Sequence, residues 1–177
     1  MAHPIHVFKY CPRCGSDLFR ASGARSLTCD SCSLQWYTNS AAAVACLIFN
    51  PNGKLLVTRR AIDPDIGKMD LPGGFIDPLE SAEDAVRREL KEELNMEVKN
   101  MVYLTSKPNE YFFSGITVFT TDLAFRVEAV DLGNLTPHDD ISSFEWIDPT
   151  EIDPNEIPAP SIRYFIKEIA PHESNHR

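Results

Sequence analysis

Residues 71–96, LPGGFIDPLESAEDAVRRELKEELNM, decide the fold because they join a sharp turn to a strongly patterned helix. The pattern predicts a helix from Ser81 to Leu94, in which Ser81 and Asp84 fit a capping box. Asn95 then stands where helices end on a left-handed residue, a conformation that Asn tolerates. One face of the helix carries an apolar stripe, formed by Ala82, Ala85, Val86, Leu90 and Leu94. The turn before the helix contains two glycines, which let backbone approach a ligand closely.

Three glutamates, Glu89, Glu92 and Glu93, gather within an arc of about 100° on one side of this helix. Like charges at this spacing destabilise a helix by about 0.2–0.5 kcal/mol per pair, a cost that bound Mg²⁺ or Mn²⁺ can offset. The alternative interpretation is a solvated acidic face, in which Arg88 pairs with Glu92 one turn away. The glycine turn in front of the helix favours a ligand site over this alternative.

The spacing of these residues resembles the Nudix box, Gly-x5-Glu-x7-Arg-Glu-U-x-Glu-Glu-x-Gly-U, in which U is an aliphatic residue. The matching positions are Gly74, Glu80, Arg88, Glu89, Leu90, Glu92, Glu93 and Met96. The single departure is Asn95, which stands where the motif has its second glycine. Because Asn also adopts a left-handed backbone, we expect the loop after the helix to keep its shape.

The resemblance implies a Nudix fold, an α/β fold in which an α/β/α sandwich is built around a mixed sheet, over about Ala41–Ala170. It also implies a Nudix-type pyrophosphohydrolase that uses Mg²⁺ or Mn²⁺ to cleave a nucleoside diphosphate linked to another moiety. By the same resemblance, the metal ligands are Glu89, Glu92, Glu93 and the carbonyl of Gly74. Arg88 and Glu80 would hold the helix and its loop in register. This assignment is chemically consistent, because bound metals stabilise developing negative charge and lower the pKa of an attacking water.

The general base is not settled by the resemblance, because Nudix enzymes differ in where it comes from. The candidates on the helix and in later segments are Glu89, Glu93, Glu110, Asp139 and Asp140. For each candidate outside the helix, an exposed structural role is the alternative. Arg59 and Arg60 end a predicted strand near the expected site, where they would either contact phosphates or face solvent.

Four of the five cysteines form two Cys-x-x-Cys pairs, at Cys11, Cys14, Cys29 and Cys32. The 14 residues between the pairs suit a tetrahedral zinc site, in which each pair binds the ion from one turn. Disulfides are the alternative, which the lack of a secretory signal disfavours. Four thiolates leave no open position for a catalytic water, so we predict a structural zinc. We therefore expect a zinc ribbon over residues 1–40 and a Nudix domain over residues 41–177.

Strand patterns flank the helix on both sides. Ala41–Phe49 and Lys54–Arg60 predict a hairpin across a turn at Asn50–Gly53. Cys46 lies inside the first, apolar strand, which favours a core residue over a reactive thiol. Further strands are predicted at Glu97–Leu104, Gly115–Val127 and Ser143–Ile147, and a final amphipathic helix at Ser161–Ala170.

Charge is unevenly distributed: residues 1–40 carry a net +2, whereas the other 137 residues carry −11. An acidic body repels polyanions unless cations intervene, which agrees with a metal-dependent site for a phosphate compound. The longest apolar run, Ala41–Phe49, is far shorter than the roughly 20 residues that span a bilayer, which argues against a membrane protein. The first ten residues lack the apolar centre of a signal peptide, so we expect a cytoplasmic protein.

A cysteine ribbon before a Nudix domain is similar to the NADH pyrophosphatase subfamily, which carries Ser-Gln-Pro-Trp-Pro-Phe-Pro-x-Ser after the box. The corresponding stretch here is Ser106-Lys-Pro-Asn-Glu-Tyr-Phe-Phe-Ser114, which lacks the tryptophan and two of the prolines. Its aromatic residues would stack on a base or pack in the core. ADP-ribose, NADH and related dinucleotides, and damaged nucleoside triphosphates therefore all stay open as substrates.

The rival hypothesis is a regulator, in which the Nudix domain senses a nucleotide and the ribbon binds nucleic acid. The weak positive balance of residues 1–40 permits this, but a nucleic-acid-binding surface is usually more basic. The intact set of three glutamates favours the enzyme, because a sensor need not keep all of them. Many Nudix proteins are dimers, so the resemblance also implies a homodimer as a candidate assembly.

Overall fold

The computed structural model describes residues 3–174. Within this range the chain divides into two compact units. The first comprises residues 3–41 and 110–120, and the second comprises residues 42–109 and 121–174. Among the described residues, no helix is both long enough and apolar enough to cross a membrane.

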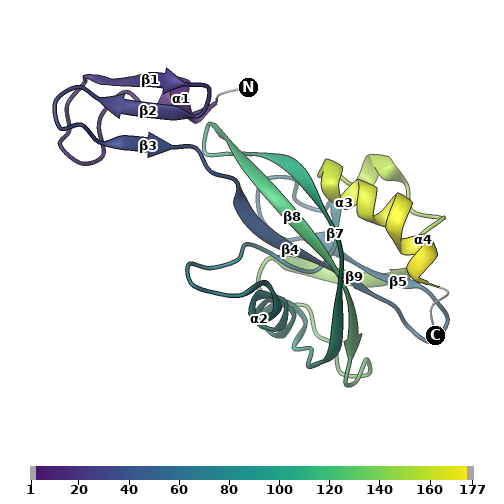
Figure 1. The fold of residues 1–177 in the computed structure, drawn as a ribbon. Coiled ribbons are helices and arrows are strands. Elements are labelled where there is room, and N and C mark those ends of the chain that lie inside the picture. Colours follow the sequence, from purple (N-terminus) through teal and green to yellow (C-terminus); the bar gives the residue numbers. More distant parts are fainter. Residues whose placement is uncertain (1–2, 175–177) are drawn as a thin grey trace. The chain divides into compact units, whose positions relative to one another are not determined.

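The N-terminal part of the chain forms a three-stranded antiparallel sheet in the order β1-β2-β3 (Figure 1). Its elements are helix α1 (Pro4–Val7) and strands β1 (Phe19–Gly23), β2 (Ser26–Cys29) and β3 (Gln35–Tyr37). Its core is small: the buried residues are Cys11, Phe19, Leu27 and Cys29, with Trp36 among those packed against them. A core of this size rarely stabilises a folded unit alone, which agrees with a need for a metal or another cross-link.

The remaining strands form two sheets, with the orders β4-β8-β7 and β6-β5-β9. They are β4 (Ala41–Ile48), β5 (Leu55–Arg60), β6 (Met69–Asp70), β7 (Val98–Phe113), β8 (Ile116–Ala129) and β9 (Ile141–Ile147). Strand β5 pairs antiparallel with both β6 and β9. Strand β7 runs well past its predicted end at Leu104, as far as Phe113, and β8 begins three residues later at Ile116.

The predicted hairpin between Ala41–Phe49 and Lys54–Arg60 is wrong, because β4 and β5 belong to different sheets. Only an isolated bridge between Phe49 and Leu55 joins them beside the turn. Residues 72–76 lie along β4 instead, in antiparallel register. The hydrogen bonds of this register run from Cys46 N to Pro72 O, from Val44 N to Gly74 O and from Ile76 N to Ala42 O. With β8 as its sheet neighbour and this segment also bonded to it, β4 has no edge left for β5.

Helix α2 (Ala82–Leu94) begins and ends where the sequence predicts. Ser81 Oγ accepts a hydrogen bond from Asp84 N at 3.1 Å and donates one to the Asp84 carboxylate at 2.7 Å. Asn95 follows the helix in the left-handed conformation, with φ at 52°. The second glycine of the Nudix box is therefore replaced by a residue that keeps the backbone conformation.

The C-terminal helical region begins close to the predicted residue but is not one regular helix. It consists of α3 (Pro160–Tyr164), a π-helical segment η2 (Phe165–Ile169) and α4 (Ala170–Glu173), and a short 3₁₀ turn η1 (Pro154–Glu156) precedes it. Pro171 has no backbone N–H to continue the α-helical pattern, and the wider π turns stand directly before it.

Apolar side chains alternate between the two faces of the strands and form two cores. In β4, Val44, Cys46 and Ile48 lie in the core that α2 covers, whereas Ala45 and Leu47 lie in the core that α3 and η2 cover. Figure 1 shows these helices on opposite sides of the strands. The α/β/α layering is therefore confirmed, and so is the prediction that Cys46 is a core residue.

Candidate functional site

Two glycines in front of α2 lie close to other groups of the protein. Gly73 has φ at 135°, and a Cβ there would lie 2.2 Å from the carbonyl oxygen of Val44. A Cβ on Gly74 would lie 2.6 Å from Oε1 of Glu89. Gly73 is thus required by its backbone conformation and its approach to β4, whereas a side chain at position 74 would displace the carboxylate of Glu89.

The guanidinium of Arg88 joins α2 to the loop before it. Its Nε and Nη2 atoms donate to the two oxygens of Glu80, each at 2.8 Å, and Nη2 also donates to the carbonyl of Phe75 at 2.9 Å. Its Nη1 atom donates to Glu89 at 2.7 Å and to Glu92 at 3.1 Å. One arginine therefore orients three of the acidic side chains that the motif singles out.

Glu80 closes the loop that leads into α2. Its carboxylate accepts a hydrogen bond from the backbone N–H of Asp77 at 2.9 Å, and its own N–H donates to the carbonyl of Asp77 at 3.0 Å. The hydrogen bond from Arg88, together with that from Asp77, lowers the pKa of Glu80 to about 2. Glu80 is therefore ionised across the physiological pH range and holds Arg88 as a fixed partner.

Glu93 is the most buried of the three helix glutamates, with a relative exposure of 5%. Its Oε2 atom accepts a hydrogen bond from the backbone N–H of Gly73 at 2.9 Å. Burial raises the pKa of Glu93 to about 9, against the effect of that hydrogen bond, and neighbouring acids including Glu89 and Asp70 raise it further. Among the described residues, Glu93 has no ion pair that would compensate the burial of a negative charge.

Glu89 is partly buried, and it lies on the same side of α2 as Glu93. Burial raises the pKa of Glu89, while the hydrogen bond and charge of Arg88 lower it. Glu92 is the more exposed partner of Arg88, with 49% of its side-chain surface accessible. The helix thus presents one buried, one partly buried and one exposed carboxylate.

Two further acids approach the helix from the loop before β9. The backbone N–H of His138 donates to the carbonyl of Glu93 at 2.8 Å, which brings Asp139 and Asp140 next to the end of α2. The charge of Asp140 contributes to the raised pKa of Glu93, and the charge of Asp139 to that of Glu89. Both candidate bases from this loop therefore lie within electrostatic reach of the helix.

Glu110, the other candidate outside the helix, belongs to the first compact unit and stays a prediction.

Asp70 was missed by the sequence reasoning, although it immediately precedes the glycine turn. Burial raises the pKa of Asp70, and the charge of Arg60 opposes this, with Arg60 Nη1 at 3.2 Å from Oδ2. Its charge also acts on Glu93. The signal that could have found it is an acid at the end of a short strand, directly before the turn that carries the motif glycine.

The two arginines at the end of β5 have different surroundings. Arg59 donates to Glu145 and Glu156, both at 3.0 Å, and is held as a structural ion pair. Arg60 pairs with Asp70 and donates to the carbonyl of Pro64 at 2.8 Å. Arg60 therefore lies beside the group of acids that includes Asp70 and Glu93, whereas Arg59 is paired with acids outside that group.

The helix glutamates fit a divalent cation by their donor chemistry. Each has one oxygen in a hydrogen bond, Glu89 and Glu92 with Arg88 and Glu93 with Gly73. Within residues 3–174, no donor contacts the second oxygen of any of the three. The carbonyl of Gly74 accepts one hydrogen bond, from Val44 N at 2.8 Å, and has a second lone pair. Hard oxygen donors of this kind suit Mg²⁺ or Mn²⁺.

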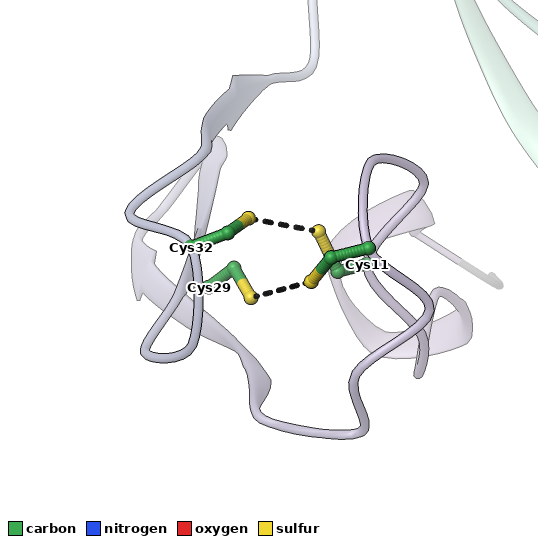
Figure 2. A group of neighbouring side chains, drawn as sticks. Cys11, Cys29 and Cys32 are labelled. Atoms are coloured by element: carbon green, nitrogen blue, oxygen red, sulfur yellow. Dashed lines mark hydrogen bonds between the residues drawn. The ribbon is translucent and has the colours of Figure 1, made fainter.

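The four cysteines of the N-terminal part come together as predicted. Their sulfur atoms all lie within 4.8 Å of one another, and the side chains labelled in Figure 2 point toward a common centre. The Sγ atoms of Cys11 and Cys32 are 3.6 Å apart, and those of Cys14 and Cys29 are 3.7 Å apart. These distances exclude disulfides, whose S–S length is about 2.05 Å, and all four thiols are free. The cluster could therefore hold a metal ion.

The two cysteine turns share one backbone geometry. In the first, Cys11 N donates to Ser16 O and Gly15 N donates to Cys11 O, both at 2.8 Å. In the second, Cys29 N donates to Leu34 O and Ser33 N donates to Cys29 O, both at 2.9 Å. Gly15 and Ser33 occupy equivalent left-handed positions, with φ at 72° and 60°. Glycine commonly adopts this conformation and serine rarely does, so the sequence carries a signal for the first turn and none for the second.

Comparison with known proteins identifies the family. A family model described as NUDIX domain matches residues 39–169, which is most of the chain. The chain belongs to the Nudix family. The expected Nudix fold with a mixed sheet is thereby confirmed.

Curated relatives of this Nudix chain carry the name NAD-capped RNA hydrolase NudC. The protein from Pseudomonas fluorescens is 28% identical over 158 residues, which cover 89% of this chain and 54% of that protein. The protein from Deinococcus radiodurans is 32% identical over 120 residues, which cover 66% of this chain and 42% of that protein. The chain thus spans about half the length of the curated relatives that it matches.

Among solved structures, a NUDIX hydrolase from Nitrosomonas europaea has the same fold over almost the whole chain. Its TM-score is 0.68 at 24% identity, and the match covers 96% of this chain and 94% of that protein. At this identity the similarity establishes the fold alone. The resemblance to zinc-ribbon-bearing Nudix proteins is confirmed by the family model, the curated relatives and the cysteine cluster together.

Proposed function

We propose that this protein is a divalent-metal-dependent hydrolase that cleaves the diphosphate linkage of a nucleoside diphosphate joined to a second moiety. The observation that carries the proposal is the arrangement around Arg88, which ties Glu80 to the loop and orients Glu89 and Glu92 next to the buried Glu93. The residues that would hold Mg²⁺ or Mn²⁺ are Glu89, Glu92, Glu93 and Gly74, through its carbonyl.

The chain's own groups have separable roles in this proposal. When bound, the metal would supply the positive charge that stabilises the diphosphate and lowers the pKa of an attacking water. Arg88 and Glu80 act as positioning residues, because they touch the metal-binding carboxylates and the loop. Gly73 N–H holds one oxygen of Glu93, which leaves its other oxygen available to the metal.

The proton of the attacking water needs a nearby carboxylate. The candidates are Glu89, Glu93, Asp139, Asp140 and Glu110. The first four have raised pKa values or act on the pKa values of one another, which supports a shared acidic site for them. Individual Asn or Gln substitutions would identify the base as the residue whose loss removes the acidic limb of the pH profile, where activity rises as the base loses its proton.

For the substrate, we propose a dinucleotide of the NAD type, free or at the 5′ end of RNA. The support is the name shared by the curated relatives. ADP-ribose and damaged nucleoside triphosphates are the alternatives, because the Ser106–Ser114 segment departs from the NADH pyrophosphatase pattern.

We further propose that residues 1–40 form a zinc ribbon attached to a Nudix domain over residues 41–177. The support is the set of four free sulfurs within 4.8 Å and the paired turns that present them. The zinc would be structural, since four thiolates complete its tetrahedral coordination.

A substrate panel tests the proposed activity. The purified chain is incubated with Mg²⁺ or Mn²⁺ and ADP-ribose, NADH, NAD-capped RNA or 8-oxo-dGTP, and the products are separated and identified. We expect cleavage within the diphosphate of at least one compound, with NADH or NAD-capped RNA preferred. Tight nucleotide binding without turnover of any compound would overturn the proposal and favour a sensor.

A further inference from the structure

The first compact unit contains an apolar pocket of about 570 Å³ that the proposed activity does not use. Its lining includes the aromatic rings of Phe8, Tyr10 and Trp36, the side chain of Lys9, and Pro12. The volume lies in the range of about 300–1,000 Å³ that is typical of small-molecule sites. Pro12 follows Cys11 directly, so the cysteine turn itself shapes one wall.

The aromatic rings of this pocket are accessible as well as clustered. Phe8 and Trp36 meet edge to face, with ring centroids 5.3 Å apart and an interplanar angle of 72°. Phe8 is 36% exposed and Tyr10 is 68% exposed. Exposed aromatic rings that meet at one pocket present flat faces to a ligand, and such patches mark binding sites.

The charge around the pocket selects the class of ligand. Lys9 is the only charged residue in its lining, and no carboxylate pairs with it within the part of the chain that the structure describes. Residues 1–40 carry a net +2, in contrast to the −11 of the rest of the chain. Aromatic faces beside an unpaired ammonium group match a base with an adjoining phosphate.

We infer that this pocket binds a base of single-stranded RNA, by stacking on the aromatic rings of Phe8, Tyr10 and Trp36 while Lys9 pairs with the adjoining phosphate. The choice of nucleic acid over an apolar peptide rests on the proposed function, because the reaction acts on nucleotides. RNA presents its bases in this way only where they are unpaired, so a duplex would not enter the pocket.

Binding of an uncapped RNA tests the inference independently of hydrolysis. The probe is a fluorescein-labelled ten-nucleotide adenosine RNA, which has no 5′ dinucleotide, and anisotropy is measured with the full, zinc-loaded chain without Mg²⁺. We expect Tyr10→Ala to weaken binding about tenfold, as loss of one stacking partner does. Lys9→Ala should also make the fall of the logarithm of the association constant with the logarithm of salt concentration less steep, by about 0.7, the value for one phosphate contact.

Matched controls separate the pocket from the rest of the surface. Tyr37→Ala removes an aromatic ring that is 48% exposed on β3 but outside the pocket, and Lys54→Ala removes an exposed cation in the second unit. Both controls should bind like the wild type. In a Trp146→Phe background, Trp36 is the only tryptophan, and the RNA should quench its emission.

The inference is overturned if Tyr10→Ala and Lys9→Ala bind the RNA like the wild type, or if Trp36 is not quenched. Equal losses in the controls, or equal affinity for duplex RNA, would also overturn it. Zinc content measured for each variant shows whether the ribbon is intact. Hydrolysis of free NADH and ADP-ribose is measured in parallel, and failure there would remove the proposed function without changing the result for RNA binding.

Discussion

Arg88 binds Glu80 through two parallel hydrogen bonds, with Nε and Nη2 each 2.8 Å from a carboxylate oxygen. The remaining nitrogen of the same guanidinium reaches Glu89 at 2.7 Å and Glu92 at 3.1 Å. Only a planar group with several donors can make these contacts together. The spacing of eight residues between Glu80 and Arg88 therefore has a physical purpose: it fixes the helix carboxylates relative to the glycine loop.

Arg88→Lys tests this positioning role. A lysine keeps the charge but cannot bind Glu80 with two hydrogen bonds and still reach Glu89, so the carboxylates lose their fixed orientation. We expect kcat to fall about 100-fold, as for misplaced catalytic groups, with a smaller change in KM. Arg87→Lys is the matched control, because the polar contacts of Arg87 within residues 3–174 are to Glu83 and Asp84, on the exposed side of the helix. Equal activity of the two variants would contradict the role.

Glu80→Gln tests the ion pair through the pH dependence of stability. The hydrogen bond from Arg88 lowers the pKa of Glu80 to about 2, below its usual 4.5. The pair therefore stabilises the fold above about pH 4.5, and this stabilisation is lost as the pH falls toward 2. We expect the Tm of the wild type to decrease more steeply over this range than that of Glu80→Gln. Glu83→Gln, on the exposed part of α2, should keep the steep decrease.

Glu93→Gln should separate stability from activity. The raised pKa of Glu93, about 9, means that its stabilising contribution is complete below about pH 4.5 and is lost as the pH rises toward 9. A glutamine keeps the hydrogen bond from Gly73 without a buried charge. We expect a higher Tm than the wild type at pH 8 without Mg²⁺, together with turnover reduced by orders of magnitude.

Addition of Mg²⁺ gives the complementary measurement for Glu93. The wild type should gain Tm with Mg²⁺, because ligand binding to the folded state stabilises it, and Glu93→Gln should gain much less. An equal Mg²⁺-dependent shift in both proteins would remove Glu93 from the metal site.

The parts of the fold that depend on local interactions were predictable. Helix α2 has its predicted ends because Ser81, Asp84 and Asn95 act within one or two turns of the chain. The hairpin prediction failed for the opposite reason. Residues 72–76 take the place beside β4, and those hydrogen bonds join segments about 30 residues apart, which no local pattern records.

In the candidate site, too, residues placed by local sequence were predictable and those placed by long-range contacts were not. Glu89, Glu92 and Glu93 lie on one helix, so their spacing alone places them together. Asp70 and Arg60 reach the same cluster from paired strands, β6 and β5, and only the strand register reveals it. The left-handed conformation of Ser33 could not be predicted either, because the sequence signals for that conformation are glycine and asparagine.

Leu79→Gly tests a strained position in the loop before α2. Leu79 has φ at 70° and is fully exposed, with a relative exposure of 108%. The left-handed conformation costs an L-residue roughly 1–2 kcal/mol, and no burial compensates it here. After allowance for the greater freedom of glycine when unfolded, we expect a gain of about 0.5–1 kcal/mol in the free energy of unfolding. Leu79→Ala keeps the strain and should show no gain in denaturant titrations.

Cys14→Ser tests the metal of the ribbon. Cys14 is the exposed member of the cluster, so its replacement disturbs little packing and mainly removes a sulfur ligand. We expect the small core around Phe19 and Leu27 to depend on the metal, so loss of the ion in a Trp146→Phe background should loosen the unit and shift the emission of Trp36 to the red. We expect the wild type to contain about one zinc per chain, the number that a single four-thiolate site takes, and the variant much less.

The matched control for this experiment is Cys46→Ala, which removes the one cysteine outside the cluster. Cys46 is fully buried between β4 and α2, so the variant should lose some stability through the cavity but keep its zinc. The zinc content of the wild type, Cys14→Ser and Cys46→Ala is measured by elemental analysis after gel filtration. Retention of full zinc content by Cys14→Ser, or loss of zinc from Cys46→Ala alone, would contradict the ribbon assignment. A wild type that holds no zinc yet keeps the emission of a partly buried Trp36 would show that the small core is stable without a metal.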